Sequence, residues 1–285
     1  MDAAGRTPEL DLSSMQTIPI CDDDLARLAA REHVLRFLAV VASDPTSARF
    51  IGILRADPQL ALAGARYIAE DPGSRPAELA PGEDPPERLD LAPIVAALRA
   101  PRQRLVDDHT RVFGLVVSKE CPPYEVQYCP QTFAVFRSQQ MADIAGFYRA
   151  FGVETGRDVP ERVDHIASEL EFLAWLVAKE RHALGREGEE WRERAAICRD
   201  AQRDFLAEHL AWWVPTFARA LADHAGLLDP PAPLYTALAH ALASLVPAER
   251  ALLDVEPPRE LASPRPEAES GVAEGCTSCT STGDP

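Results

Sequence analysis

The sequence has almost no lysine, little glycine and no long hydrophobic run. Only two of its 29 basic residues are lysines, Lys119 and Lys179, and glycine contributes 15 of the 285 residues. The longest apolar stretches, 37–42 and 172–178, fall far short of the ~20 residues that a membrane-spanning helix requires. Residues 1–12 contain no basic region followed by an apolar one, so they lack the pattern of a secretory signal. We therefore expect a soluble protein of the cytoplasm.

A positively charged surface is also missing. The chain carries 45 acidic and 29 basic residues, which gives a formal net charge of −16. Such a surface repels phosphate backbones and anionic lipids, so the charge balance argues against binding to nucleic acids or to membranes. Six cysteines in a long chain without an export signal do not suggest a disulfide framework.

Signatures of the common catalytic sites are absent as well. There is no glycine-rich phosphate loop, no G-x-G-x-x-G after a strand, no G-x-S-x-G nucleophile turn and no H-E-x-x-H motif. Nothing in the sequence demands catalysis, so we expect neither an enzyme nor a resident cofactor.

What the sequence does contain is helical periodicity over most of its length. Apolar residues recur at helical spacing, and we find no period-two alternation and no hairpin signal. The pattern predicts an all-α fold, a single globular domain of about nine or ten helices. The expected helices cover 22–42, 47–54, 59–69, a stretch from 91, 102–117, 133–151, 161–183, 187–210, 213–225 and 234–245.

Clusters of proline and acidic residues divide the chain. We expect a flexible arm over 1–20, a helical domain over 21–250, and a disordered acidic tail over 251–285 that ends in a C-x-x-C pair. Within the domain, residues 71–90 contain five prolines and six acidic residues, which predicts a linker or a long surface loop.

Residues that could carry chemistry concentrate between positions 121 and 165. The segment Cys121-Pro-Pro-Tyr124-Glu125 is a rigid loop with one aromatic ring and one carboxylate. Its plain interpretation is a buried turn in which the tyrosine packs and the glutamate caps a neighbour. Asp164 and His165 are expected in the first turn of the 161–183 helix, where the carboxylate could orient the imidazole or simply cap the helix.

Two further acidic residues follow on the same predicted helix. Glu169 lies four residues after His165, and Glu171 lies seven after Asp164. Di-iron bundles use two Glu-x-x-His pairs, whereas this chain has one His-x-x-x-Glu order and no second copy. A carboxylate-bridged metal site is therefore not expected.

The cysteines leave one metal or redox alternative open. Cys276 and Cys279 have the spacing of ligands or of a redox pair, although they lie in a Ser/Thr/Gly-rich tail. Cys121 and Cys129 are the only plausible additional donors, and their spacing matches no standard zinc knuckle. An inert tail is the plainer interpretation of this C-x-x-C.

Four segments in a fixed order resemble a known family. They are His109-Thr-Arg-Val-Phe113-Gly, Pro122-Pro-Tyr-Glu125, residues 140–152 (Gln-Met-Ala-Asp-Ile-Ala-Gly-Phe-Tyr-Arg-Ala-Phe-Gly), and residues 161–172 (Glu-Arg-Val-Asp-His-Ile-Ala-Ser-Glu-Leu-Glu-Phe). This order resembles the TorD/DmsD/NarJ family of redox-enzyme maturation chaperones over residues 25–245. It is most similar to the branch that serves type II enzymes of the dimethyl-sulfoxide-reductase family.

The resemblance implies an all-helical chaperone without catalytic activity. Such a chaperone binds the molybdenum-containing catalytic subunit in the cytoplasm, assists insertion of its molybdopterin cofactor, and screens its twin-arginine signal peptide before export. It also implies functional roles for Tyr124, Glu125, Asp164 and His165. The family often has tyrosine where His109 stands, and Glu-Pro where Glu161 and Arg162 stand, which weakens the alternative of a guanine-nucleotide-binding regulator.

The chemistry of a signal peptide suggests what its receptor must offer. A cationic segment followed by an apolar one requires carboxylates beside an apolar groove. The carboxylates would come from Glu125, Asp164, Glu169 and Glu171, and the walls from Phe136, Ile144, Phe147, Tyr148, Phe172 and Trp175. Most of these aromatics are expected in the core, with Tyr148 and Trp175 as the exposed exceptions. The chain is expected to be a monomer or a domain-swapped dimer.

Overall fold

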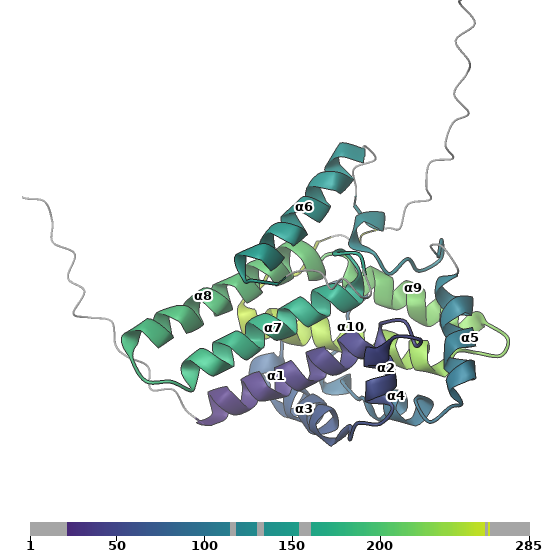
Figure 1. The fold of residues 1–285 in the computed structure, drawn as a ribbon, viewed down its shortest axis with the longest axis horizontal. Coiled ribbons are helices and arrows are strands. Elements are labelled where there is room, and N and C mark those ends of the chain that lie inside the picture. Colours follow the sequence, from purple (N-terminus) through teal and green to yellow (C-terminus); the bar gives the residue numbers. More distant parts are fainter. Residues whose placement is uncertain (1–21, 115–117, 130–133, 154–160, 260–261, 263–285) are drawn as a thin grey trace, which may run out of the picture.

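A computed structural model describes residues 22–114, 118–129, 134–153, 161–259 and 262. Within these ranges the chain forms ten α-helices and no strand beyond a single bridge, which confirms the predicted all-α fold (Figure 1). The helices are α1 (Asp22–Val41), α2 (Ala48–Ile53), α3 (Gln59–Glu70), α4 (Ala92–Ala97), α5 (Arg102–Phe113), α6 (Ala134–Ala150), α7 (Ile166–Leu184), α8 (Glu189–Phe205), α9 (Val214–Leu227) and α10 (Pro233–Leu253).

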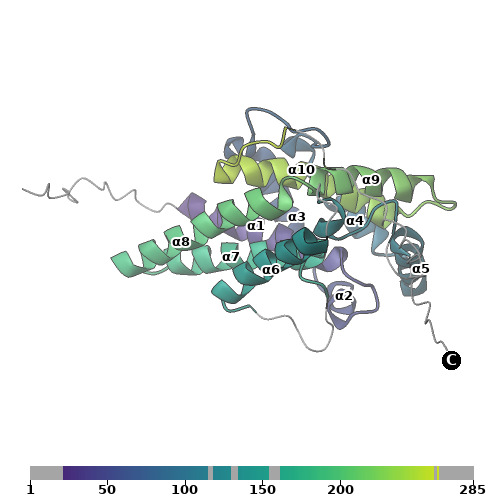
Figure 2. The same cartoon turned by 90° about the horizontal axis from the view of Figure 1, so that it is seen from above.

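The long helices form one packed body. Helix α7 packs between α1 and α8, and α10 packs along α9 (Figures 1 and 2). One continuous core of buried apolar side chains joins these helices. Helix α6 projects from the body above α7 and α8 (Figure 1). None of the helices in the described ranges is long and apolar enough to cross a membrane.

Helix α1 shows how the sequence specifies a central element. Three aspartates, Asp22 to Asp24, stand in its first turn, where negative charge stabilises the helix dipole. One face of α1 packs against the core, and Arg31 on that face is fully buried. The Arg31 guanidinium donates to both carboxylate oxygens of Glu249 on α10, at 3.0 and 2.6 Å. This pairing is what allows two charged groups to lie inside the core.

Several helix ends differ from the sequence-based prediction. Helix α7 begins at Ile166, five residues later than expected, because His165 caps its first turn. Helix α5 ends at Phe113 because Gly114 takes a positive φ of 73°. Helix α8 ends at Phe205 and passes into a π-helical turn over Leu206–Leu210. Helix α10 runs eight residues beyond the predicted end, with Pro247 inside it.

The proline-rich segment 71–90 is a structured loop that packs on α10. It contains two short 3-10 turns, Pro72–Ser74 and Pro86–Arg88. The buried carboxylate of Glu83 accepts two hydrogen bonds from Arg250 on α10, at 2.8 and 2.6 Å. The loop is therefore part of the folded body. The predicted arm over 1–20 and most of the predicted tail lie outside the described residues.

Candidate functional site

The loop before α6 and the start of α7 meet in a short β-type pairing. The Glu125 N–H donates to the Asp164 carbonyl at 2.9 Å, and the Ile166 N–H donates to the Pro123 carbonyl at 3.0 Å. The pairing brings the rings of Tyr124 and His165 edge to face, with centroids 5.2 Å apart. The two segments singled out in the sequence thus form one junction in the structure, which we call the loop–α7 junction.

His165 is the N-cap of α7. Its Nδ1 atom accepts a hydrogen bond from the Ala167 N–H at 3.1 Å, which satisfies one of the free donors of the first helical turn. Burial lowers the pKa of His165 to about 3, so the ring is neutral. The capping interpretation of this pair therefore applies, with histidine rather than aspartate as the cap.

Asp164 is fully buried and is held by Arg162. The Arg162 guanidinium donates to both Asp164 oxygens, at 2.9 and 2.8 Å, and lies over the Tyr124 ring at 4.2 Å from its centroid. The Val126 N–H also points at Asp164, at 3.4 Å. The carboxylate therefore ties α7 to the loop and does not face solvent.

Glu125 lies at the centre of the junction. Its buried carboxylate accepts hydrogen bonds from Gln140 Nε2 at 2.7 Å and from Trp212 Nε1 at 3.2 Å. His209 Nδ1 lies 3.2 Å from the same carboxylate. Because Gln140 belongs to α6 and His209 to the π-helical turn, Glu125 joins these elements to the loop. The sequence pattern alone gives Gln140 and His209 no role, although each is a polar residue on an otherwise apolar helical stripe.

Glu169 faces Glu125 from the first turn of α7. Its Oε2 atom accepts a hydrogen bond from Trp213 Nε1 at 3.2 Å, while its Oε1 atom receives none from a described residue. Burial raises the pKa of Glu169 well above its ordinary value, and the neighbouring Glu125 carboxylate raises it further. The pKa of Glu125 is also raised by burial. Burial and this neighbouring charge therefore both favour the neutral form of Glu169.

Only part of the expected binding groove reaches the surface. Glu125, Asp164 and Glu169 lie inside the protein, and of the four acidic residues only Glu171 is exposed, paired with Arg49. Trp175 is 39% exposed, as expected. Tyr148 was expected to be exposed, but this expectation is wrong. The structure buries its ring and its hydroxyl donates to the Val163 carbonyl at 2.8 Å.

The expected apolar walls also separate into core and surface residues. Ile144 and Phe172 lie in the core, whereas Phe147 is half-buried against it. The side chain of Phe136 lies outside the described residues. Most of these side chains therefore stabilise the fold, which leaves Trp175 as the exposed wall.

The cysteine alternative finds no support in the described part of the chain. Burial raises the pKa of the Cys121 thiol to about 12 and that of the Cys129 thiol to about 11, so neither is a ready thiolate. No group of three His, Cys, Asp or Glu side chains among the described residues is arranged to hold a metal ion. Cys276 and Cys279 lie outside the described residues.

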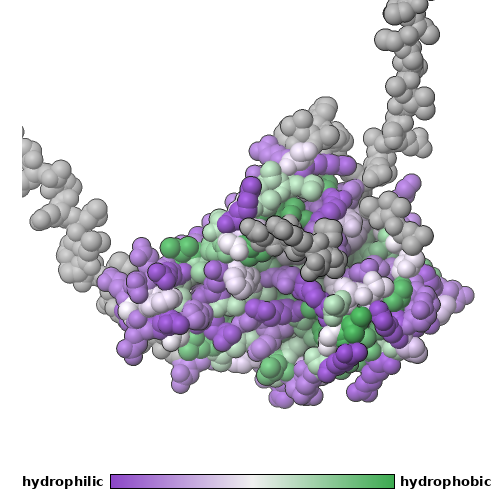
Figure 3. All heavy atoms as spheres, viewed as in Figure 1, coloured by the Kyte–Doolittle hydropathy of each residue, from purple (hydrophilic) through white to green (hydrophobic). Residues whose placement is uncertain are grey.

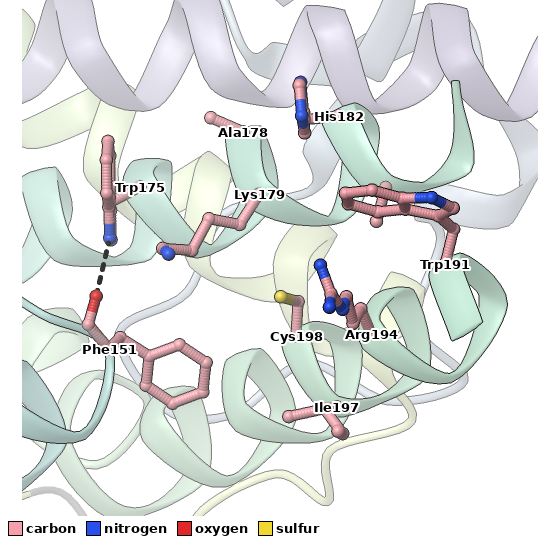
Figure 4. Close-up of a pocket in the computed structure, with 10 residues that line it drawn as sticks. Phe151, Trp175, Ala178, Lys179, His182, Trp191, Arg194, Ile197 and Cys198 are labelled. Carbon is pink, nitrogen blue, oxygen red and sulfur yellow. Dashed lines mark hydrogen bonds between the residues drawn. The ribbon is translucent and has the colours of Figure 1, made fainter. Parts of the chain in front are cut away.

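An open groove lies between α7 and α8, next to the end of α6. Its volume is about 520 Å³, and its lining includes Phe151, Trp175, Trp191 and Ile197. Trp175 stands at one end and Trp191 at the other, with Lys179, Arg194 and Cys198 between them (Figure 4). Apolar side chains reach the surface over α8, among hydrophilic ones (Figure 3). This groove offers an accessible apolar surface that the buried junction does not.

Comparison with known proteins points to one family. Residues 81–219 match the family described as nitrate reductase delta subunit, a range that includes the whole loop–α7 junction. A selenate reductase assembly chaperone protein of Thauera selenatis is 38% identical over 121 residues, which is 42% of this chain and 55% of that protein. A chlorate reductase assembly chaperone protein of Ideonella dechloratans is 42% identical over 81 residues, 28% of this chain and 39% of that protein.

A more distant relative supports the same assignment. The chaperone protein TorD of Vibrio cholerae is 35% identical over 81 residues, which is 28% of this chain and 33% of that protein. The chain thus aligns with between one third and about one half of the length of these three relatives.

Proposed function

We propose that the chain is a member of the TorD/DmsD/NarJ family and acts as a system-specific assembly chaperone for the catalytic subunit of a reductase. The observation that carries the proposal is the match over residues 81–219, which contains the loop–α7 junction and both walls of the α7–α8 groove. The names of the relatives describe assembly chaperones of selenate and chlorate reductases.

The finer proposal concerns the client. We propose that it is the molybdenum-containing subunit of an enzyme of the dimethyl-sulfoxide-reductase family. The chaperone would bind this subunit in the cytoplasm, keep it open for insertion of the molybdopterin cofactor, and hold back its twin-arginine signal peptide until assembly is complete. The four ordered segments that resemble this family support the proposal.

The described geometry favours binding over catalysis. The carboxylates of Glu125, Asp164 and Glu169 are buried and already bonded within the protein, and the neutral His165 uses its Nδ1 atom to cap α7. A catalytic acid or base must reach its substrate, and these groups do not. We propose that they hold the loop, α6 and α7 in a fixed arrangement that presents a binding surface.

We propose that the client binds to those residues of the predicted site that are exposed. Glu171 and Trp175 are four residues apart on α7, so they share one face of the helix. Tyr124 is half-buried at the loop–α7 junction, and the Arg162 guanidinium lies over its ring. Tryptophan is one of the residues that most often anchor protein partners.

Deletion of the gene in its native host tests the proposed function. We expect the deletion strain to lose the activity of one molybdenum reductase and to accumulate its catalytic subunit without cofactor, and we expect the wild-type gene on a plasmid to restore both. If every molybdenum reductase of the host keeps full activity and cofactor content after the deletion, the proposed function is wrong.

A further inference from the structure

The α7–α8 groove is apolar but has a cationic rim. Lys179 Nζ lies 5.0 Å from the centroid of the Trp175 ring. The guanidinium groups of Arg186 and Arg194 lie 4.8 and 4.5 Å from the centroid of Trp191. Each of these contacts is within the range of a cation–π interaction. Lys179 and Arg194 thus line the groove together with the two tryptophans, and Arg186 lies over the Trp191 ring next to it.

These cations are not neutralised by the described residues. None of the three has a carboxylate oxygen within 4.0 Å in the described part of the chain, although most arginines on α7 and α8 do. The acidic residues at the start of α8, such as Glu189, Glu190 and Glu193, are exposed and do not line the groove. An unpaired positive rim is unusual on a chain with a net charge of −16.

The chemistry of the groove defines its ligand. Ile197 is 54% exposed and Trp175 is 39% exposed. A ligand that covers these two side chains with its own apolar groups would therefore bind favourably. Carboxylates would pair with the rim, whereas the cationic end of a signal peptide would be repelled. The groove therefore selects a segment that combines apolar side chains with negative charge.

We infer that residues 8–20 of this chain dock in the α7–α8 groove. This segment carries large apolar side chains at five positions and two carboxylates, and no Arg or Lys occurs between positions 7 and 26. The apolar residues are Leu10, Leu12, Met15, Ile18 and Ile20, and the acidic ones are Glu9 and Asp11. The other long segment outside the described residues, 263–285, contains Val272 as its one large aliphatic residue and also carries Arg265.

The position of α1 brings this segment within reach. Glu32 on α1 accepts hydrogen bonds from Arg181 on α7 at 2.9 and 2.7 Å, which fixes the register of the two helices. Asp22 begins α1 ten residues earlier, about 15 Å along the helix axis. That end of α1 lies at the same end of the molecule as the α7–α8 connection (Figures 1 and 2). The thirteen residues of segment 8–20 span about 40 Å when extended. This length is enough for the segment to run back from the start of α1 to Trp175.

Docking of this segment would regulate the proposed client surface. Trp175 belongs both to the groove and to the surface assigned to the client, so segment 8–20 and the client would compete for it. Because the segment is covalently attached, its effective concentration is of millimolar order, and a weak contact suffices to occupy the groove. This regulatory consequence rests on the proposed function, whereas the docking itself does not.

A fluorescein-labelled peptide of residues 7–20 tests the docking by anisotropy on the full-length protein. In the wild type the attached segment competes with the peptide. In a Leu12→Asp/Ile18→Asp double variant the attached segment loses two apolar side chains and no longer competes. We therefore expect the peptide to bind this variant about tenfold more tightly than the wild type. A Ser13→Asp/Ser14→Asp variant adds the same charges at polar positions and should bind the peptide like the wild type. Equal affinity for all three proteins, or no saturable binding to any, would overturn the inference.

Groove variants in the Leu12→Asp/Ile18→Asp background locate the contact. Arg194→Glu reverses a charge in the groove, and Arg192→Glu reverses one on the same helix outside it. We expect the first to weaken peptide binding about fivefold and the second less than about twofold, with the difference shrinking in high salt. Equal losses from both variants would place the peptide elsewhere and overturn the inference. No reductase is present in this assay, so its failure would leave the proposed function standing.

Discussion

The Glu125 carboxylate and the His209 imidazole lie side by side in the interior, with Oε2 and Nδ1 3.2 Å apart, although 84 residues separate them in the chain. The contact joins the Pro-Pro-Tyr-Glu loop to the π-helical turn after α8. Gln140 from α6 and Trp212 donate to the same carboxylate. A buried carboxylate with several partners is costly to disrupt, so the loop is a fixed part of the framework. Variants inside this network are therefore expected to change stability, and variants on the surface of α7 to change binding.

The raised pKa of Glu169 predicts that the protein loses stability as the pH rises from acid to neutral. Above the ordinary glutamate pKa, the unfolded chain releases protons that the folded pair of Glu125 and Glu169 retains. The free energy of unfolding therefore falls with pH from about 4.5 up to the raised pKa of the pair. Glu169→Gln keeps the acceptor for Trp213 and removes this titration. We compare the decrease in unfolding free energy between about pH 5 and about pH 7 in the two proteins. This decrease should be smaller in Glu169→Gln than in the wild type, by at least about 1 kcal/mol.

Urea unfolding followed by circular dichroism at the two pH values measures this difference. Glu171→Gln, on the exposed face of the same helix, is the control and should retain the pH dependence of the wild type. If Glu169→Gln shows the wild-type dependence, the raised pKa of Glu169 is not the source of the pH dependence.

Asp164→Ala is expected to destabilise the fold. The substitution removes the acceptor of two Arg162 hydrogen bonds and of the Val126 N–H at a fully buried position. We expect a loss of about 1–3 kcal/mol in the free energy of unfolding. Glu171→Ala removes an ion pair whose side chains are both about half exposed, and should cost less than about 1 kcal/mol. Equal losses in the two variants, measured by urea unfolding, would show that the Asp164 network does not stabilise the junction.

Trp175→Ala is expected to weaken client binding without unfolding the protein. The ring is partly exposed, and loss of a tryptophan anchor commonly costs a complex about 2 kcal/mol or more, so the affinity should fall about thirtyfold or further. Leu60→Ala is the matched control, because Leu60 is 62% exposed on α3, away from this face. Binding to the purified catalytic subunit can be measured by calorimetry. A client affinity that is unchanged in Trp175→Ala would remove this residue from the binding surface.

Glu83→Ala is expected to release the loop over 71–90. The carboxylate accepts two hydrogen bonds from the buried Arg250, which would be left with an unpaired charge. Removal of one partner of a buried ion pair costs about 3–5 kcal/mol. Limited trypsin digestion should therefore cut between Arg88 and Leu89 faster in the variant than in the wild type. Unchanged cleavage at this site would mean that the ion pair does not hold the loop.

The sequence was sufficient to predict the fold class and most of the helices, because helices are encoded locally. Apolar spacing placed α1, α3 and α6 within a few residues of their positions in the structure. The ends that failed depend on interactions that spacing does not encode. The cap of α7 requires the His165 ring to turn back onto Ala167, and Pro247 is tolerated inside α10 although proline usually ends a helix.

The sequence predicted which residues form the site, but it did not predict that most of them are buried. Sequence order indicated that Tyr124, Glu125, Asp164 and His165 belong together, and the loop–α7 junction unites them. Their burial follows from contacts with residues far away in the chain, such as His209, which no local pattern reports. The same applies to the α7–α8 groove, since Trp191 and Arg194 meet Trp175 only when the two helices pack. The α7–α8 groove is lined by Lys179 and Arg194, and it is distinct from the acidic groove that signal-peptide chemistry led us to expect.

Co-purification from the native host tests the central claim most directly. The tagged full-length protein would be isolated from cells that express a molybdenum reductase, and the bound proteins identified by mass spectrometry. We expect to recover one catalytic subunit of the molybdopterin family without its cofactor, in wild-type and Leu60→Ala samples and at a much lower level with Trp175→Ala. If no such subunit is recovered from cells that demonstrably synthesise one, the proposed chaperone function is wrong.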